Sequence, residues 1–134
     1  MTYVLTTERM PPLADGVVDF PAQKTMYGGR KIAAGDTVFV FVRGADGAAL
    51  TAKATVLTAS PDPPSPHLER QTPRVSVTLR LEAQAVRALS RTEVARLATG
   101  DPAVEELRFK FFRQATPKIG AVSDALAAFL EGCV

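Results

Sequence analysis

The chain has 134 residues, of which 46% are hydrophobic and 22% charged, and its formal net charge is +2. A domain of this size can bury enough surface to fold without disulfides or metals, and its single cysteine excludes a disulfide framework and a cysteine-rich metal site. The small net charge excludes nucleic-acid binding through bulk charge, so any such surface must be local.

The first residues carry neither the cationic lead nor the apolar run of a signal peptide, and no segment reaches the roughly 20 apolar residues of a membrane span. A lone cysteine is typical of a reducing compartment. We therefore expect a cytoplasmic protein without membrane partners, folded as a single domain over residues 1–134. It would be a monomer, or a homodimer formed through an exposed edge strand.

The first part of the chain predicts two strands separated by a long loop. A short β-branched run over 3–6 indicates the first strand. Residues 8–34 are interrupted by Pro-Pro, Asp-Gly, Phe-Pro and Gly-Gly pairs and predict a loop, which at this length is often functional. The run over 37–43 is apolar on both faces, which predicts a strand buried on both sides, as in a small barrel with a helix packed outside.

A hairpin and a proline-rich loop follow. Asp46-Gly47 favours the positive φ of a hairpin turn, so residues 48–59 are predicted to be the return strand. Residues 60–66 contain several prolines and cannot form the interior of a strand or helix, because proline lacks the N–H donor. The strict alternation of apolar and polar residues over 74–81 predicts a half-buried strand.

The remaining chain predicts helices and one more strand. The capping box at residues 90–93 and the pair Asp101-Pro102 each predict a helix start, and Ser123 predicts the cap of a last helix. Residues 109–113 are predicted to return to a strand. The expected fold class is therefore α+β, a small, mixed and mainly antiparallel β-barrel with short flanking helices.

Residues that could perform catalysis are few. The only histidine, His67, lies in the proline-rich loop, and Cys133 stands next to the C-terminal residue, where we expect a poorly ordered thiol. No zinc-ligand spacing occurs, and Gly28-Gly29 indicates a turn rather than a phosphate-binding loop, because no Gly-Lys-Ser or Gly-Lys-Thr follows. We predict no catalytic residue, no metal and no cofactor.

Two clusters combine aromatic side chains with cations and contain no acidic residue. One covers residues 24–31 and the other residues 109–120. Aromatic faces stack on bases and cations neutralise phosphates, so this mixture is typical of a surface that holds a nucleotide. Each cluster also has a plainer interpretation: the first as a flexible basic loop, and the second as an amphipathic strand followed by a strand-to-strand turn.

Two stretches resemble the PUA-like superfamily, and most closely its EVE domains and their ASCH relatives. One is the Gly35-Asp36 turn with the strand over 37–42 and the return strand over 51–56, and the other is the segment 113–123. The resemblance implies a pseudo-barrel with a cleft that binds RNA or DNA, often a flipped modified base. EVE domains usually carry tryptophans near the first strand and in the following loop, whereas this chain has none and offers only Tyr3 and Tyr27.

We expect a non-catalytic module that binds nucleic acid, either RNA or a modified base held in a cleft. One alternative, implied by the ASCH relatives, is a hydrolase of modified nucleosides that uses Lys24 and Thr25 with an acidic partner such as Glu82. Another alternative is a protein-interaction module. The candidate ligand-binding residues are Thr6, Thr7, Lys24, Tyr27, Arg30, Arg113, Gln114, Thr116 and Lys118.

Overall fold

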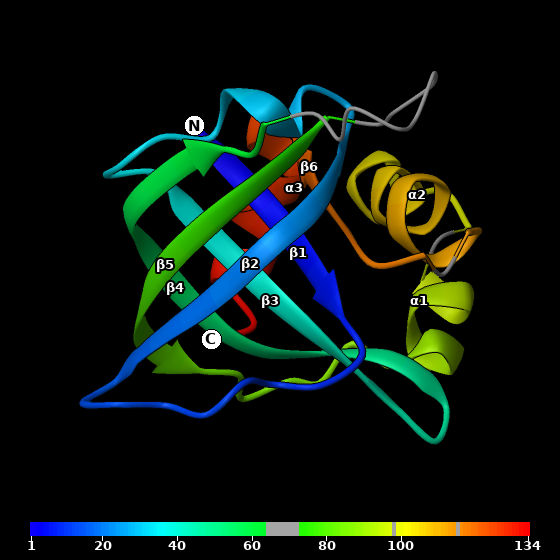
Figure 1. Cartoon of the computed structure of the whole chain (residues 1–134). Helices are drawn as coiled ribbons and strands as arrows, with labels where there is room; N and C mark the ends of the chain where they lie inside the picture. Colours follow the sequence, from blue (N-terminus) through cyan, green and yellow to red (C-terminus); the bar gives the residue numbers. More distant parts are fainter. Residues whose placement is uncertain (64–72, 98, 115) are drawn as a thin grey trace.

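The computed structural model describes residues 1–63, 73–97, 99–114 and 116–134. In this part of the chain, strands close into one barrel in the order β1-β3-β4-β5-β2-β6 (Figure 1). The pairs β1–β3 and β2–β6 are parallel and the other neighbours are antiparallel. The strands are β1 (Thr2–Thr7), β2 (Val17–Met26), β3 (Thr37–Gly44), β4 (Gly47–Pro61), β5 (Arg74–Gln84) and β6 (Lys118–Ala121).

Short helices flank the barrel, and Figure 1 shows α1 and α2 beside each other next to it. No helix within the described ranges is long and apolar enough to span a membrane. The predicted α+β class, a mixed and mainly antiparallel barrel with short flanking helices, is confirmed. The helices are η1 (Gly29–Lys31), α1 (Arg91–Leu97), α2 (Pro102–Leu107), the π-helical segment η2 (Arg108–Phe112) and α3 (Asp124–Glu131).

Strand β3 separates two hydrophobic clusters, as its apolar faces predicted. Val38 and Val40 belong to the cluster inside the barrel, whereas Phe39 and Phe41 belong to the cluster between the barrel and the helices. All four side chains are buried. Successive residues of a strand point to opposite faces, so a strand that is apolar on both faces holds the helical layer to the barrel.

The predicted helix caps are confirmed. The backbone N–H of Glu93 donates to Ser90 Oγ at 3.3 Å, and that of Ala103 donates to Asp101 Oδ1 at 3.0 Å. The N–H of Leu126 donates to the Ser123 hydroxyl oxygen at 3.2 Å. Each side chain accepts a hydrogen bond from an N–H that has no partner within its helix, and this is why the sequence predicts these helix starts.

The predicted loop over 8–34 is wrong for its middle part, because Val17–Met26 form strand β2. The Phe-Pro pair that suggested a loop lies at a bulge, where the register with β5 shifts between Phe20 and Gln23. Ala22 has a φ of 52° there, and its N–H donates to Ser76 Oγ at 2.9 Å. A bulge tolerates Pro21 because a bulged residue makes no hydrogen bond to the neighbouring strand.

The predicted strand over 109–113 is also wrong. The chain continues from α2 into the π-helical segment η2, and the strand comes later, at β6. Helical spacing buries Phe111 and Phe112, at 2% and 8% exposure, and leaves Phe109 at 51%. A strand-to-strand turn is the plainer interpretation of the residues after 113, but Lys118–Ala121 form β6, which closes the barrel between β1 and β2.

The C-terminus is held by hydrogen bonds. The carbonyl oxygen of Cys133 accepts from the N–H groups of Val86 and Arg87 at 2.9 and 3.2 Å, and the thiol is buried. The expectation of a poorly ordered thiol is therefore wrong, and burial raises the pKa of that thiol. The candidate His67 lies outside the described residues.

Candidate functional site

Three cations lie level with one another on neighbouring strands. Lys24 of β2 pairs with Arg74 of β5, and the residue after it, Thr25, pairs with Ile119 of β6. Lys24 is therefore also level with Lys118, the first residue of β6. We term Lys118, Lys24 and Arg74 the basic row. Like charges opposite one another on adjacent strands repel, and among the described residues none of the three forms an ion pair.

Lys118 is the buried member of the basic row, at 1% exposure. Its Nζ donates to the carbonyl oxygen of Gln114 at 2.9 Å and lies 5.8 Å from the centre of the Phe111 ring. Burial, and then repulsion by Lys24, lower the pKa of Lys118. An anion beside the row would oppose both effects, because it would stabilise the charged amine and offset the repulsion.

Thr6 fixes Lys118 through the backbone. Its hydroxyl oxygen accepts the Lys118 N–H at 3.0 Å and lies 3.4 Å from the Lys118 carbonyl oxygen. Thr6 is 5% exposed, so it positions the row rather than offering a free polar group. Thr7, the last residue of β1, donates its hydroxyl to the Arg9 carbonyl oxygen at 3.1 Å.

A cavity of about 270 Å³ opens beside the exposed part of the basic row. Lys24 and Arg74 contribute its charge, and the guanidinium of Arg74 is held by a hydrogen bond to the Ala22 carbonyl oxygen at 2.8 Å. Gln23 and Thr116 contribute polar groups. We term this space the basic cavity; it is lined by Ala22, Gln23, Lys24, Arg74, Thr116 and Pro117.

Two glycines let neighbouring segments approach β6 closely. A Cβ at Gly120 would lie 2.9 Å from the Phe111 ring, and a Cβ at Gly29 would lie 2.1 Å from the Ile119 carbonyl oxygen. The hollow beside Thr6 and Phe111 has a volume of only about 30 Å³, room for about one water. Among the described residues, protein atoms therefore fill this part of the outer face of β6, and the basic cavity offers a larger ligand more room.

The structure brings together Thr6, Lys24, Thr116 and Lys118, with the backbone of Gln114. Thr7 lines the small hollow together with Thr6, whereas Tyr27, Arg30 and Arg113 lie apart from this group. Tyr27 follows β2 at the far end of β6, where its ring meets the edge of Phe111 with centroids 6.4 Å apart and lies 5.3 Å from Lys110 Nζ. Arg30 is exposed on η1, and Arg113 lines a different cavity.

Sequence reasoning missed Arg74 and Gln23. Arg74 was recognised only as an outward-facing strand residue, and Gln23 lay in a stretch interpreted as a loop. Their place beside Lys24 depends on the pairing of β2 with β5, two segments about 50 residues apart in the chain. The signal that could have found them is the alternation of Val18 and Phe20 with polar residues, which marks the first half of β2.

The structure does not assemble the residues named for a hydrolase. Glu82 lies eight residues beyond Arg74 on β5, which at strand rise is about 26 Å from the level of Lys24. Thr25 is buried, and its hydroxyl donates to the Pro73 carbonyl oxygen at 2.7 Å. The Lys24 side chain therefore has neither Glu82 nor a free Thr25 hydroxyl beside it.

Replacing Lys118 by methionine tests the cost of burying this amine. The folded pKa lies below the ordinary value of 10.5, so the unfolded chain binds the proton more tightly, and the wild type gains stability as the pH rises towards 10.5. Lys118→Met lacks this dependence, and at neutral pH we expect it to be more stable by on the order of 1 kcal/mol. Urea unfolding of both proteins from neutral to alkaline pH measures the difference. Parallel curves with a less stable variant would mean that the bond to Gln114 outweighs desolvation.

The barrel order and the flanking short helices give the chain the architecture of a small PUA-like barrel. Its fold is similar to the DUF55 domain of human thymocyte nuclear protein 1, with a TM-score of 0.65 and 14% identity over 98% of this chain and 97% of that one. A structure of the same human protein in complex with DNA containing 5-methylcytosine has a TM-score of 0.66 and 13% identity, over 98% of this chain and 95% of that one. A protein from Pseudomonas putida has a TM-score of 0.63 and 13% identity, over 98% of both chains.

No family model matches the chain, and no curated protein matches it by sequence. The similarity to these solved structures nevertheless extends over nearly the full length of both chains compared. It therefore includes the complete barrel and its helices. The chain therefore has the same fold as these proteins, a small mixed barrel with short helices, which confirms the fold that the sequence resemblance implied.

Proposed function

We propose that the chain is a non-catalytic binding module for nucleic acid, and that the basic row and the basic cavity form its contact surface. The observation that carries the proposal is the row itself. Lys118, Lys24 and Arg74 lie level on adjacent strands, and Lys118 is buried without an ion-pair partner among the described residues. This arrangement costs stability in the free protein, and bound phosphate would offset that cost.

The ligand class is supported by the comparison with the human protein of the same fold, whose structure contains DNA with 5-methylcytosine. On this basis we infer that a modified base is the part of the nucleic acid that is recognised. The basic cavity is the place we assign to it. Gln23 already donates its amide nitrogen to the Pro21 carbonyl oxygen at 2.7 Å, which leaves its amide oxygen to accept from an exocyclic amine such as that of cytosine.

Removing either exposed cation of the row should weaken binding. We expect Lys24→Ala and Arg74→Ala each to reduce affinity about tenfold and to lower the slope of log affinity against log salt by about 1. Arg80→Ala is the matched control, because Arg80 lies on the same face of β5, six residues from Arg74. Fluorescence anisotropy with RNA, unmodified DNA and DNA containing 5-methylcytosine, at several salt concentrations, gives these values.

The series also separates charge from base recognition. A cation that contacts phosphate changes affinity for all sequences alike, whereas Gln23→Ala should reduce only the difference between modified and unmodified DNA. Absence of binding to every nucleic acid at low salt would refute the proposal. Equal losses in Arg74→Ala and Arg80→Ala would show that binding follows overall charge and not the basic row.

A further inference from the structure

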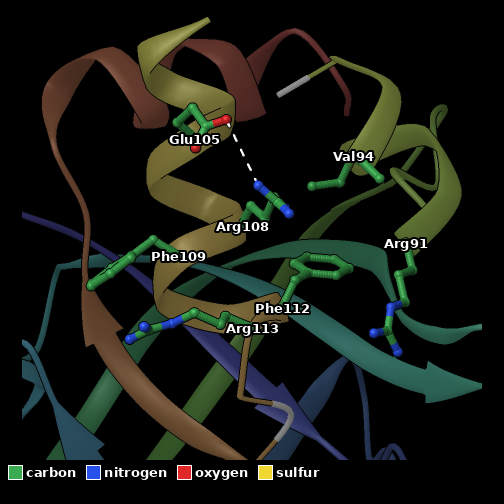
Figure 2. Close-up of a pocket in the computed structure, with 8 residues that line it drawn as sticks. Arg91, Val94, Glu105, Arg108, Phe109, Phe112 and Arg113 are labelled. Carbon is green, nitrogen blue, oxygen red and sulfur yellow. Dashed lines mark ion pairs between the residues drawn. The ribbon is translucent and has the colours of Figure 1, made fainter. Parts of the chain in front are cut away.

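A second cavity, of about 410 Å³, lies between α1, α2 and the π-helical segment η2 (Figure 2). Phe109 and Phe112 form its apolar part, and three arginines and one glutamate form its polar part. It contains none of the residues of the basic row. We term it the arginine cavity; it is lined by Arg91, Val94, Ala95, Glu105, Arg108, Phe109, Phe112 and Arg113.

The arginine cavity has an excess of positive charge. Its one carboxylate, Glu105, lies 4.0 Å from a guanidinium nitrogen of Arg108, and both side chains are more than half exposed. An exposed ion pair at this distance contributes about 0–1 kcal/mol and is easily exchanged for another anion. Arg91 and Arg113 form no ion pair within the described ranges. The cavity therefore presents guanidinium groups that an anion can reach.

One of these guanidinium groups is already held in place. The guanidinium carbon of Arg113 lies 4.1 Å from the centre of the Phe109 ring, and Figure 2 shows the two side chains side by side at the cavity. Stacking restricts a long side chain that would otherwise lose rotamer freedom on binding. It also explains why Phe109 remains 51% exposed on a short helical segment. A stacked guanidinium presents its N–H groups in a fixed plane, which suits the oxygens of a phosphate.

A small hollow lies between the arginine cavity and the basic cavity and shares lining residues with each. The small hollow beside Thr7 shares Arg91 and Phe112 with the arginine cavity and shares Pro117 with the basic cavity. The linings of the three spaces therefore adjoin one another and form a track on the protein surface. A ligand that carries a charge at every repeat can follow such a track, whereas a single small anion would occupy only one of its cavities.

We propose that the arginine cavity binds a phosphate group of the same nucleic acid that is held at the basic row. This inference rests on the proposed function and extends it, since it gives the strand a second point of contact and a direction over the protein. Arg113, whose guanidinium is already held against Phe109, binds the phosphate, and Arg108 exchanges Glu105 for it. Arg91, on the other side of Phe112 (Figure 2), adds to the positive charge of the cavity. The hollow beside Thr7 lies under the connecting part of the backbone.

The double variant Arg91→Ala/Arg113→Ala tests the second contact. We expect its affinity for the best-bound oligonucleotide to fall about tenfold or more, with the salt slope lower by about 1. Arg80→Ala/Arg96→Ala removes the same charge, and Arg96 lies on the same helix as Arg91 without lining the cavity. This control should bind like the wild type apart from a small change at low salt.

A charge-preserving variant shows whether the cavity acts as a shaped site. Arg113→Lys keeps the charge but loses the planar group that stacks on Phe109, so we expect a loss of binding of several-fold. Binding equal to the wild type would overturn the shaped site. An acidic peptide of matched charge should compete poorly, and competition as strong as that of the oligonucleotide would assign the cavity to acidic proteins instead.

The possible failures are distinguishable. If the wild type binds no nucleic acid, both the proposed function and this inference are refuted. If the wild type binds and depends on Lys24 and Arg74, but Arg91→Ala/Arg113→Ala behaves like its control, only the second contact is refuted.

Discussion

Replacing Gly29 by alanine is expected to lower the free energy of unfolding by about 3 kcal/mol or more. The new Cβ would lie 2.1 Å from the carbonyl oxygen and 2.8 Å from the carbonyl carbon of Ile119. Both atoms are backbone of β6, which is hydrogen-bonded to β1 on one side and β2 on the other. A backbone held on both sides cannot move away as the end of a flexible side chain can, so the clash must shift η1 or open the barrel.

Gly44→Ala is the matched control for this prediction. A Cβ at Gly44 would meet its nearest atom, the Gly47 carbonyl oxygen, at an ordinary 3.8 Å. In a strand this exchange should be neutral or stabilising by about 0.5–1 kcal/mol, because glycine loses more freedom on folding than alanine. Urea unfolding followed by circular dichroism compares the two variants with the wild type. An unchanged midpoint for Gly29→Ala would show that the close approach of η1 to β6 is not needed for the fold.

The same substitution connects stability with the site. Ile119 follows Lys118 directly, so a displacement of its carbonyl also moves the base of the buried lysine. Any Gly29→Ala protein that still folds should therefore bind nucleic acid less tightly, although Gly29 lies on neither cavity.

The features predicted correctly from sequence depend on neighbours in the chain. A helix cap needs only the residues of one turn, and Asp101-Pro102 specifies it locally. The run over 37–43 is apolar on both faces wherever it is placed, so its burial follows from composition and period. The barrel class could be inferred because such local patterns, taken in order, predict mostly strands, with a few short helices in the last third of the chain.

The basic row could be predicted only in part, because it is a product of strand register. Lys24 and Lys118 stand out in the sequence as members of clusters without acidic residues, and the structure places them level with each other. Arg74 joins them only because a bulge at Pro21 shifts β2 against β5. A shift of one residue would turn the Lys24 side chain to the other face, and no local pattern fixes that shift.

The phenylalanines of residues 109–112 show how a wrong period misplaces side chains. In a strand, Phe109 and Phe111 would share a face and Phe112 would oppose them. In the π-helical segment, Phe111 and Phe112 are buried and Phe109 lies against Arg113 at a cavity. The sequence thus correctly suggests that most of these rings are core, but the identity of the exposed ring follows from the continuation of α2 into η2.

Phe111→Ala is expected to destabilise the protein by about 3–5 kcal/mol, the usual cost of removing a buried phenyl ring. The ring fills the space above Gly120, meets the edge of Tyr27 and lies near Lys118 Nζ, so its loss leaves a cavity that glycine cannot fill. Phe109→Ala removes the same group two residues earlier in the sequence, from a ring that is half exposed. We expect a change of only about 0.5 kcal/mol there.

Urea midpoints of the two variants, measured together, decide between the helical and the strand arrangement of this segment. The helical arrangement requires a large difference between them, because only Phe111 packs against β6. If residues 109–113 formed a strand, Phe109 and Phe111 would face the same core and their losses would be similar. Equal losses would therefore also remove the stacked Phe109–Arg113 pair on which the arginine cavity depends, so this comparison of stabilities tests the binding track without any nucleic acid.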